Sequence, residues 1–194
     1  MSATLILGMF VGLLPCADCS AIRTQLTLDP EYYELRETYL GTERSLRYRG
    51  RWKANGDIIA LEGEARRSFR AVGDSELRLL DGEQREVDSK APHSLYWAVV
   101  LTPRDKGSIV ELKRGRSLVV RLPSERLPGY AWQRVPAKSD ILTPLGDVAY
   151  EESTETWMFA VSGAGQEELG FEYRQPSQPK EASAARLGFL IRAR

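Results

Sequence analysis

The chain has 194 residues, enough for one large β domain or for two domains of roughly a hundred residues each, and we expect two. It carries 27 Lys and Arg residues and 27 Asp and Glu residues, so its formal net charge is zero. Because there is no basic field to hold polyanions, nucleic acid is excluded as an expected partner. Hydrophobic residues make up 42% of the chain and charged residues 28%, which is typical of a folded globular protein.

The first apolar segment is TLILGMFVGLL, residues 4–14. It is too short to span a membrane, and no basic residues precede it, so it fits a signal peptide poorly. Its alternation instead predicts a β-strand. We interpret Met1-Ser2 as a remnant that replaces a removed export signal.

Period-two alternation continues along the first half of the chain and predicts antiparallel strands. Turn-forming sequences separate these runs, at Asp29-Pro30, at Gly41, in ANGD from Ala54 and in LDGE from Leu80. One predicted strand carries a row of arginines. Such a row could bind acids, but it is more typical of the solvated outer face of a strand, which is the interpretation adopted here. The row consists of Arg47, Arg49 and Arg51.

The second half repeats the pattern after a break. Residues 88–94 predict a loop, residues 95–101 an apolar strand, and residues 102–106 a linker. Further strands are expected near residues 109–111, 118–122, 157–161, 169–173 and 187–191. The sequence therefore predicts an all-β protein with a barrel or sandwich in each half, residues 1–101 and residues 107–194.

Groups suited to catalysis are few. His93 is the only histidine, and it lies in a proline-flanked loop with no nucleophile motif beside it. No Walker loop, HExxH or GxGxxG motif is present, and GAGQEELG from Gly163 is better explained as a hairpin turn between strands. We therefore expect a protein that is not an enzyme.

The two cysteines lie together in LPCADCS, as Cys16 and Cys19. This C-x-x-C spacing, at the start of a helical turn, permits a structural disulfide, a pair of thiolate ligands for a soft metal such as copper(I), or a redox couple, and all three stay open. A closed zinc site is not expected, because it would need four ligands. In an oxidising compartment a disulfide would occlude both ligands until it is reduced.

The first hundred residues resemble the N-terminal domain of the NlpE family, lipoproteins of the bacterial outer membrane associated with copper resistance and envelope stress. The resemblance rests on GLLPCADCSAIRTQLTL, YYELRETYLG, GRWKANGDIIAL and LRLLDGEQREV. It implies a small, partial lipocalin-like barrel that carries Cys16 and Cys19 on a helical loop. It also implies a periplasmic protein held by a lipid anchor at the outer membrane, and we expect the anchor to belong to the native precursor.

The remainder is similar to chagasin-like inhibitors of papain-type cysteine proteases, which are immunoglobulin-like β-sandwiches. GSIVELKRGRSLVVRLPSERLPGYAWQ and MFAVSGAGQEELGFEYRQP carry this resemblance. It implies three loops at one end of the sandwich that enter the protease cleft. By this resemblance the loops are Leu127, Pro128, Gly129 and Tyr130; Glu151, Glu152, Ser153 and Thr154; and Arg174, Gln175, Pro176 and Ser177.

The loops depart from the family pattern at three places. Leu127-Pro128 stands where a threonine pair is usual, Glu151-Glu152 replaces glycines, and Ser177 replaces an aromatic residue. Aromatic anchors supply much of the energy of such interfaces, and an acidic pair adds a desolvation cost unless the target provides a base. These departures argue against tight inhibition.

The main hypothesis is a non-enzymatic envelope protein that senses or binds through the C-x-x-C loop and uses the sandwich to bind a protein partner. The alternative is a cysteine-protease inhibitor. A third hypothesis places an apolar ligand inside the barrel. We instead expect the barrel's own aromatic side chains to fill it, namely Phe10, Tyr33, Tyr39, Tyr48 and Trp52.

Overall fold

The computed structural model describes residues 6–87, 90–124, 127–137, 139–151, 153–177 and 182–194. The chain divides into two compact units, Met1–Ala98 and Val99–Arg194, and the boundary falls inside strand β8. Apart from one 3₁₀ turn, Pro103–Asp105, every regular element in these ranges is a strand. The predicted all-β fold is therefore confirmed. No helix in the described ranges is long and apolar enough to cross a membrane.

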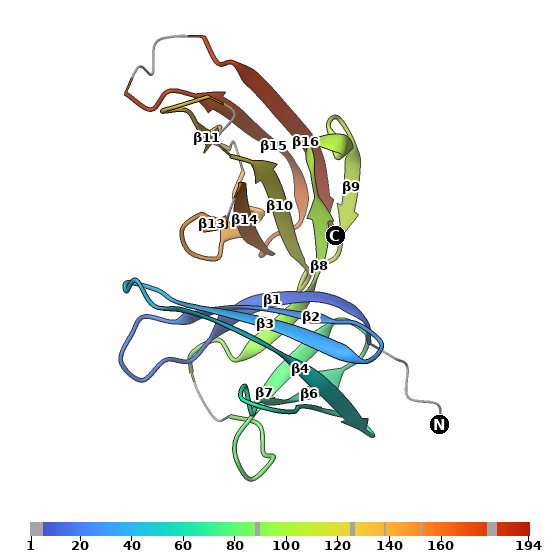
Figure 1. The fold of residues 1–194 in the computed structure, drawn as a ribbon. Helices are drawn as coiled ribbons and strands as arrows, with labels where there is room; N and C mark the ends of the chain where they lie inside the picture. Colours follow the sequence, from blue (N-terminus) through green and yellow to red (C-terminus); the bar gives the residue numbers. More distant parts are fainter. Residues whose placement is uncertain (1–5, 88–89, 125–126, 138, 152, 178–181) are drawn as a thin grey trace. The chain divides into compact units, whose positions relative to one another are not determined.

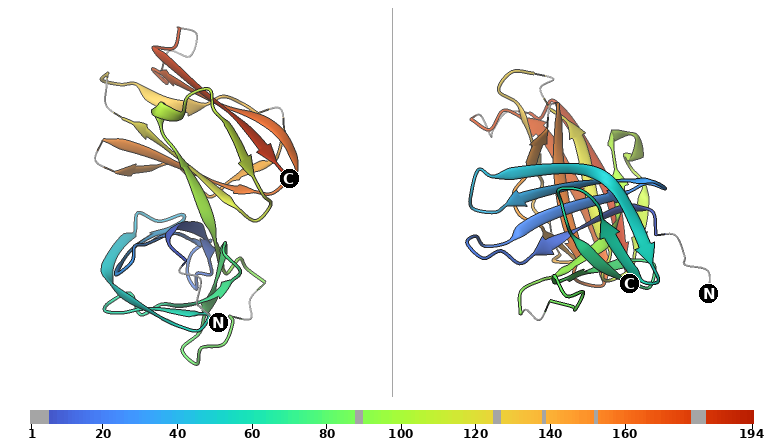
Figure 2. Two further views of the ribbon diagram at one scale, coloured as in Figure 1. Left: turned by 90° about the vertical axis from the view of Figure 1, so that its right-hand side faces the viewer. Right: turned by 60° about the horizontal axis from the view of Figure 1, so that its bottom comes forward.

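The first unit is an up-and-down barrel of eight strands, whose ring is visible in the left view of Figure 2. Each strand is antiparallel to the next, and β1 also pairs with β8 through Phe10 with Trp97 and Val11 with Tyr96. The barrel is therefore closed. Its strands are β1 (Gly8–Leu14), β2 (Ile22–Leu28), β3 (Tyr32–Tyr39), β4 (Ser45–Asn55), β5 (Ile58–Leu61), β6 (Ser68–Val72), β7 (Glu76–Leu80) and β8 (Ser94–Leu101).

The barrel interior is filled by the inward-facing side chains that the alternation of the sequence predicts. Phe10 and Tyr33 are fully buried, and Tyr39, Tyr48 and Trp52 pack against the same core while partly exposed. The expectation that these aromatic residues fill the interior is confirmed. The buried core residues of this unit are Phe10, Leu14, Ile22, Leu26, Leu28, Tyr33, Leu35, Ile59, Leu61, Phe69, Leu77, Leu79 and Leu95.

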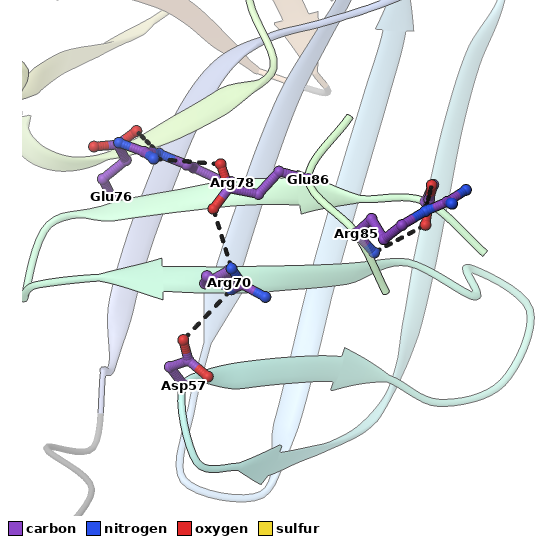
Figure 3. A network of polar contacts seen from close by, with 7 residues as sticks. Asp57, Arg70, Glu76, Arg78, Arg85 and Glu86 are labelled. Carbon is purple, nitrogen blue, oxygen red and sulfur yellow. Dashed lines mark hydrogen bonds and ion pairs between the residues drawn. The ribbon is translucent and has the colours of Figure 1, made fainter. Parts of the chain in front are cut away.

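Ion pairs connect the outer faces of β6 and β7 with the segments next to them, as Figure 3 shows. Glu86 lies between two guanidinium groups, 3.3 Å from Arg70 and 3.4 Å from Arg78. Arg70 also lies 3.4 Å from Asp57, and Arg78 lies 2.8 Å from Glu76. The network links the turn after β4 to the segment after β7 across the outside of the sheet.

The predicted arginine row lies on the outer face of β4, at exposed positions. Arg47 and Arg49, together with Arg36 of β3, surround one carboxylate, that of Glu34, at 3.1, 2.7 and 2.6 Å. Partial burial raises the pKa of Glu34, but hydrogen bonds from the three arginines outweigh it and lower that pKa to about 2. Arg47 and Arg49 therefore form surface ion pairs, and the Arg51 guanidinium lies over the Tyr32 ring, as the solvated-face interpretation predicts.

The second unit is a sandwich of two sheets (Figure 1). One sheet contains the end of β8, β10 (Ser117–Pro123), β14 (Thr154–Val161) and, along the edge of β14, β12 (Leu142–Pro144) and β13 (Ala149–Glu151). The other sheet has the order β11 (Ala131–Arg134), β15 (Gly165–Arg174), β16 (Ala185–Ala193) and β9 (Ile109–Leu112).

Inward-facing residues of both sheets meet in one core, as the predicted immunoglobulin-like sandwich requires. Phe171 lies at its centre without solvent exposure, and the edge of the Trp157 ring packs against it. The buried core residues of this unit are Leu101, Leu112, Leu118, Val120, Leu122, Trp132, Ile141, Leu142, Phe159, Val161, Leu169, Phe171, Tyr173, Phe189, Ile191 and Ala193.

The segment predicted as a linker, residues 102–106, contains the 3₁₀ turn. Its N-cap is Thr102, whose backbone N–H and hydroxyl both donate to the Asp105 carboxylate, at 2.8 and 2.9 Å. Such a capping box stabilises the first turn of a helix. The role of this segment as a linker between domains of residues 1–101 and 107–194 remains a prediction.

We predict that Gly50→Ala destabilises the barrel. A Cβ at this position would lie 2.8 Å from the Glu62 carbonyl oxygen and 2.9 Å from Cε1 of Tyr33. Overpacking of this kind costs about 1–3 kcal/mol. Urea denaturation followed by intrinsic fluorescence should show the loss. Gly82→Ala is the matched control, because a Cβ there meets no atom within 4 Å; equal effects of the two changes would contradict the prediction.

Candidate functional site

The disulfide loop, residues 15–21, joins β1 to β2 at one rim of the barrel. Cys16 and Cys19 form a disulfide with an S–S distance of 2.05 Å. Both cysteines are half-buried and pack against the barrel core, whereas Ala17 and Asp18 between them are exposed. The loop is thus an accessible bend outside the core, and the two sulfur atoms are bonded to each other.

The loop is fastened to the neighbouring turn between β3 and β4. The Leu40 N–H donates to the Ala21 carbonyl at 3.0 Å, and the Ser20 hydroxyl donates to the Leu40 carbonyl at 3.2 Å. The expectation of a helical loop is wrong, because residues 17–20 form bends and not a helical turn. β1 and β2 are antiparallel: Gly8 pairs with Leu28 at one end, and Leu14 pairs with Ile22 at the end next to the loop. The loop therefore has to reverse the chain direction within seven residues.

The disulfide decides what this loop offers chemically. A cysteine binds a metal through its thiolate form, and a disulfide contains no thiolate. Cys16, Asp18 and Cys19 place ligand atoms within 4.8 Å of one another, but the S–S bond uses both sulfur atoms. This argues against the expected copper(I) site at the pair in its oxidised form.

The loop end of the second unit gathers segments from all three predicted loops. The first and third loops meet where the Leu127 N–H donates to the Tyr173 hydroxyl at 3.0 Å, beside Arg174. The residue directly after β10, Ser124, donates its N–H to the Ser153 carbonyl of the second loop at 2.8 Å. The ring of Tyr130 lies 5.6 Å from that of Tyr173.

The predicted loop residues differ in exposure. Leu127, Pro128, Gly129, Glu151, Ser153, Pro176 and Ser177 are exposed, whereas Tyr130, Thr154, Arg174 and Gln175 are half-buried. Glu152 lies outside the described residues. A large apolar surface is offered by Leu127, 43% exposed, and by Tyr150 of β13, 67% exposed. Tyr150 was not among the predicted loop residues. The binding role of all these residues remains a prediction.

A buried acid supports the loop end. Glu155, at the start of β14, is 1% exposed, and its Oε1 accepts a hydrogen bond from the Trp132 N–H at 3.3 Å. Its Oε2 is buried and has no hydrogen-bond partner within the described part of the chain. Burial raises the pKa of Glu155, and the Trp132 hydrogen bond offsets only part of this increase.

Glu155 is not among the residues predicted from the sequence, although its position in the strand carries a signal. The side chains of Trp157, Phe159 and Val161 point inward from β14. Glu155 lies two residues before Trp157 and therefore on the same, inward face of the strand. A charged residue at an inward position of an apolar strand indicates a special environment.

We predict that the Cys16→Ser/Cys19→Ser variant still folds and loses only part of its stability. The disulfide closes a loop of only four residues, counted from Cys16 to Cys19, so the chain-entropy estimate is about 2 kcal/mol. Thermal unfolding monitored by circular dichroism measures the change. Ala17→Ser, which leaves the disulfide intact, is the control. Complete unfolding of the double variant would contradict the surface position assigned to the loop.

We also predict that Glu155→Gln removes a pH-dependent loss of stability. Because the folded pKa is raised, the native state retains the proton longer than the unfolded chain, whose reference value is 4.5. The stability of the native protein relative to the variant should fall as pH rises from 4.5 through the raised pKa. Urea denaturation at a series of pH values measures this difference, and a difference that is constant with pH would contradict the prediction.

In comparison with known protein families, residues 10–90 match the NlpE N-terminal domain. The lipoprotein NlpE of Escherichia coli strain K12 is 34% identical over 90 residues, which are 43% of this chain and 38% of that protein. The chain thus spans well under half of the length of this relative.

Two solved structures also resemble parts of the chain. A lipoprotein from Shewanella oneidensis is 32% identical, with a TM-score of 0.42, covering 48% of this chain and 88% of the other. The cysteine protease inhibitor EhICP2 from Entamoeba histolytica is 14% identical, with a TM-score of 0.46, covering 50% of this chain and 95% of the other. From residue 10 to residue 90, where the disulfide loop lies, this chain is therefore similar to the NlpE N-terminal domain.

Proposed function

We propose that this protein is a non-enzymatic, exported protein of the bacterial envelope, of the NlpE type. In this proposal its native precursor is held by lipid at the outer membrane on the periplasmic side. The disulfide loop takes part in sensing or binding under envelope stress, and the loop end of the second unit binds a protein partner.

The observation that carries this proposal is the disulfide within the NlpE-like segment. Structural disulfides persist in oxidising compartments such as the periplasm and are rare in the cytosol. The Cys16–Cys19 bond therefore fits export, and it lies inside the stretch that matches the NlpE N-terminal domain. The name of the 34% identical relative, a lipoprotein, supports the lipid anchor.

Expression of the native gene in its own host tests the proposal on export. We expect the protein to sediment with the envelope fraction and to incorporate labelled palmitate, because a lipid chain is what holds such a protein at a membrane. Recovery in the cytosolic fraction without label would contradict the proposal.

The role of the disulfide loop is tested with the Cys16→Ser/Cys19→Ser variant in a host that carries an envelope-stress reporter. We expect the variant to lose at least half of the reporter response to copper or to overproduction of the protein. Asp18→Ala is the matched control, since it changes the same exposed bend and leaves the disulfide in place. A response equal to that of the native protein would contradict a sensing role.

Copper(I) binding should depend on reduction. The oxidised protein has no free thiolate, so we expect it not to compete with a bicinchoninate probe for copper(I). The reduced protein has two soft ligands and should compete, whereas reduced Cys16→Ser/Cys19→Ser should not. Competition by the oxidised protein that equals that of the reduced one would contradict this assignment.

A second candidate function, inhibition of papain-type cysteine proteases, is favoured by one observation. Loops separated by up to about fifty residues meet at one end of the sandwich, through Leu127 with Tyr173 and Ser124 with Ser153. A convergent set of loops is a common way to build a binding surface. Leu127 and Tyr150 would be its exposed apolar anchors, and Ser177 supplies no aromatic anchor.

Inhibition of papain by the full chain tests this alternative. We expect inhibition only at micromolar concentrations, with Gly129→Glu weakening it at least tenfold. Gly129 has φ +75° and lies at the first loop, so the change adds both charge and backbone strain there. Lys113→Glu is the control, because residue 113 follows β9 and precedes β10, at the opposite end of β10 from the loops. Full papain activity at a hundred micromolar protein would eliminate the alternative.

A further inference from the structure

The turn between β4 and β5 contains Asn55-Gly56, which includes the single asparagine of the chain. Asn55 pairs with Ile58 across the hairpin, so only Gly56 and Asp57 form the connection between the two strands. Asn55, Gly56 and Asp57 are all exposed. The asparagine therefore lies at the edge of a tight turn that is fully accessible to water.

An asparagine that precedes glycine can react with its own backbone. The deprotonated backbone nitrogen of the glycine attacks the amide carbon of the asparagine side chain, a new N–C bond closes a five-membered succinimide ring, and the side-chain nitrogen leaves as ammonia. Water then opens the ring at one of its two carbonyl carbons and yields aspartate or isoaspartate. Glycine favours this attack because it has no side chain to hinder the close approach of its backbone.

The fold leaves both reacting groups free. In the described part of the chain, neither the side-chain amide of Asn55 nor the N–H of Gly56 has a hydrogen-bond partner. A Cβ placed on Gly56 would meet no atom within 4 Å, so the surroundings of this residue are open. An exposed side chain without partners exchanges among its rotamers, and this exchange brings the Asn55 amide carbon toward the Gly56 nitrogen.

The chain has one other acidic or amide residue directly before a glycine, Asp81-Gly82, and the fold restrains it. Oδ1 of Asp81 accepts from the backbone N–H groups of Arg85 and Glu83, both at 2.9 Å, and Oδ2 accepts from Arg85 Nε at 3.2 Å. The bond from the Arg85 N–H is the main cause of a lowered pKa of Asp81. A fixed, ionised carboxylate resists nucleophilic attack, so the structure singles out Asn55.

The reaction products would alter the hairpin that Asn55 closes. Isoaspartate lengthens the main chain by one atom within a connection of two residues, and the register of a hairpin depends on the length of its loop. The pair between Asn55 and Ile58 would therefore be lost. Both products also place a new carboxylate next to Asp57, whose own carboxylate lies 3.4 Å from Arg70 in the ion-pair network of Figure 3.

We propose that Asn55 is a site of spontaneous covalent modification in the folded protein: it is deamidated through a succinimide with the Gly56 nitrogen, with water as the co-reactant, to aspartate and isoaspartate. In the isoaspartate form the end of the β4–β5 hairpin is unpaired. The site shares no residue with the disulfide loop or the predicted binding loops, so it stands or falls separately from the proposed function.

Incubation of the full chain at pH 8 and 37 °C for two weeks tests the proposal. We expect a new form that is one mass unit heavier and more acidic on ion exchange, because the formal net charge changes from zero to −1. Peptide mapping should place isoaspartate at residue 55. Asn55→Gln should yield at least tenfold less of the acidic form, because glutamine would have to close a larger ring.

An unstructured Lys-Ala-Asn-Gly-Asp-Ile peptide, incubated in parallel, shows that the conditions allow the reaction. A full chain that stays unmodified while this peptide converts would overturn the proposal. An acidic form that appears equally in Asn55→Gln would overturn the assignment to Asn55.

The double variant Asn55→Gln/Asp81→Asn separates the effect of the fold from that of the dipeptide. It places the same Asn-Gly pair in the restrained turn, where the side-chain oxygen can still accept from the N–H groups of Glu83 and Arg85. We expect residue 81 to react at least tenfold more slowly than Asn55 does in the native chain, and the two rates to become equal in urea. Equal rates in the folded proteins would overturn the claim that the open turn selects Asn55.

Hydrogen exchange tests the structural consequence. The isoaspartate form, separated by ion exchange, should exchange its backbone amides at residues 58–60 at least tenfold faster than the unmodified protein, because these residues lose their end of the hairpin. Exchange in β2, which lies on the other side of β3 from β4, is the internal control and should not change. Unchanged exchange at residues 58–60 would overturn the loss of pairing.

Discussion

Each unit of this protein depends on burying one face of every strand, and this single constraint decides where chemistry can occur. Strand side chains alternate between two faces, so a strand that fills a core with one face leaves only its ends and its outer face for other roles. In the barrel the inward face holds Phe10, Leu26 and Phe69, all without solvent exposure, and the outer face of β3 and β4 is covered by ion pairs around Glu34. The candidate sites are therefore at the ends of strands.

The two sites use this constraint differently. At the rim of the barrel, a disulfide shortens the connection between β1 and β2 and leaves its middle exposed, so the loop is ordered without being buried. At the loop end of the sandwich, long connections are tied together by Tyr173 and by the buried Glu155. The first arrangement suits a response to the redox state of the surroundings, and the second suits contact with another protein.

The alternation of apolar residues was sufficient to predict the fold class and most long strands, because strands such as β3 and β15 bury a regular face. Short edge strands were missed: β12 and β13 have three residues each, too few to show a period.

The disulfide could not be separated from a metal site, since the spacing of Cys16 and Cys19 fits both and only three-dimensional structure and compartment decide. The clustering of the loops came from the resemblance to known inhibitors, because contacts such as that between Leu127 and Tyr173 join distant parts of the sequence.

The central claim is that the disulfide loop lies outside the barrel core and is oxidised where the protein works. Thiol trapping in intact cells tests it most directly: cells that express the native gene are quenched in acid, treated with a maleimide of known mass, and the protein is weighed by mass spectrometry. The account predicts no added maleimide without reductant and two after denaturation with reductant. Two maleimide groups on the untreated protein would contradict it.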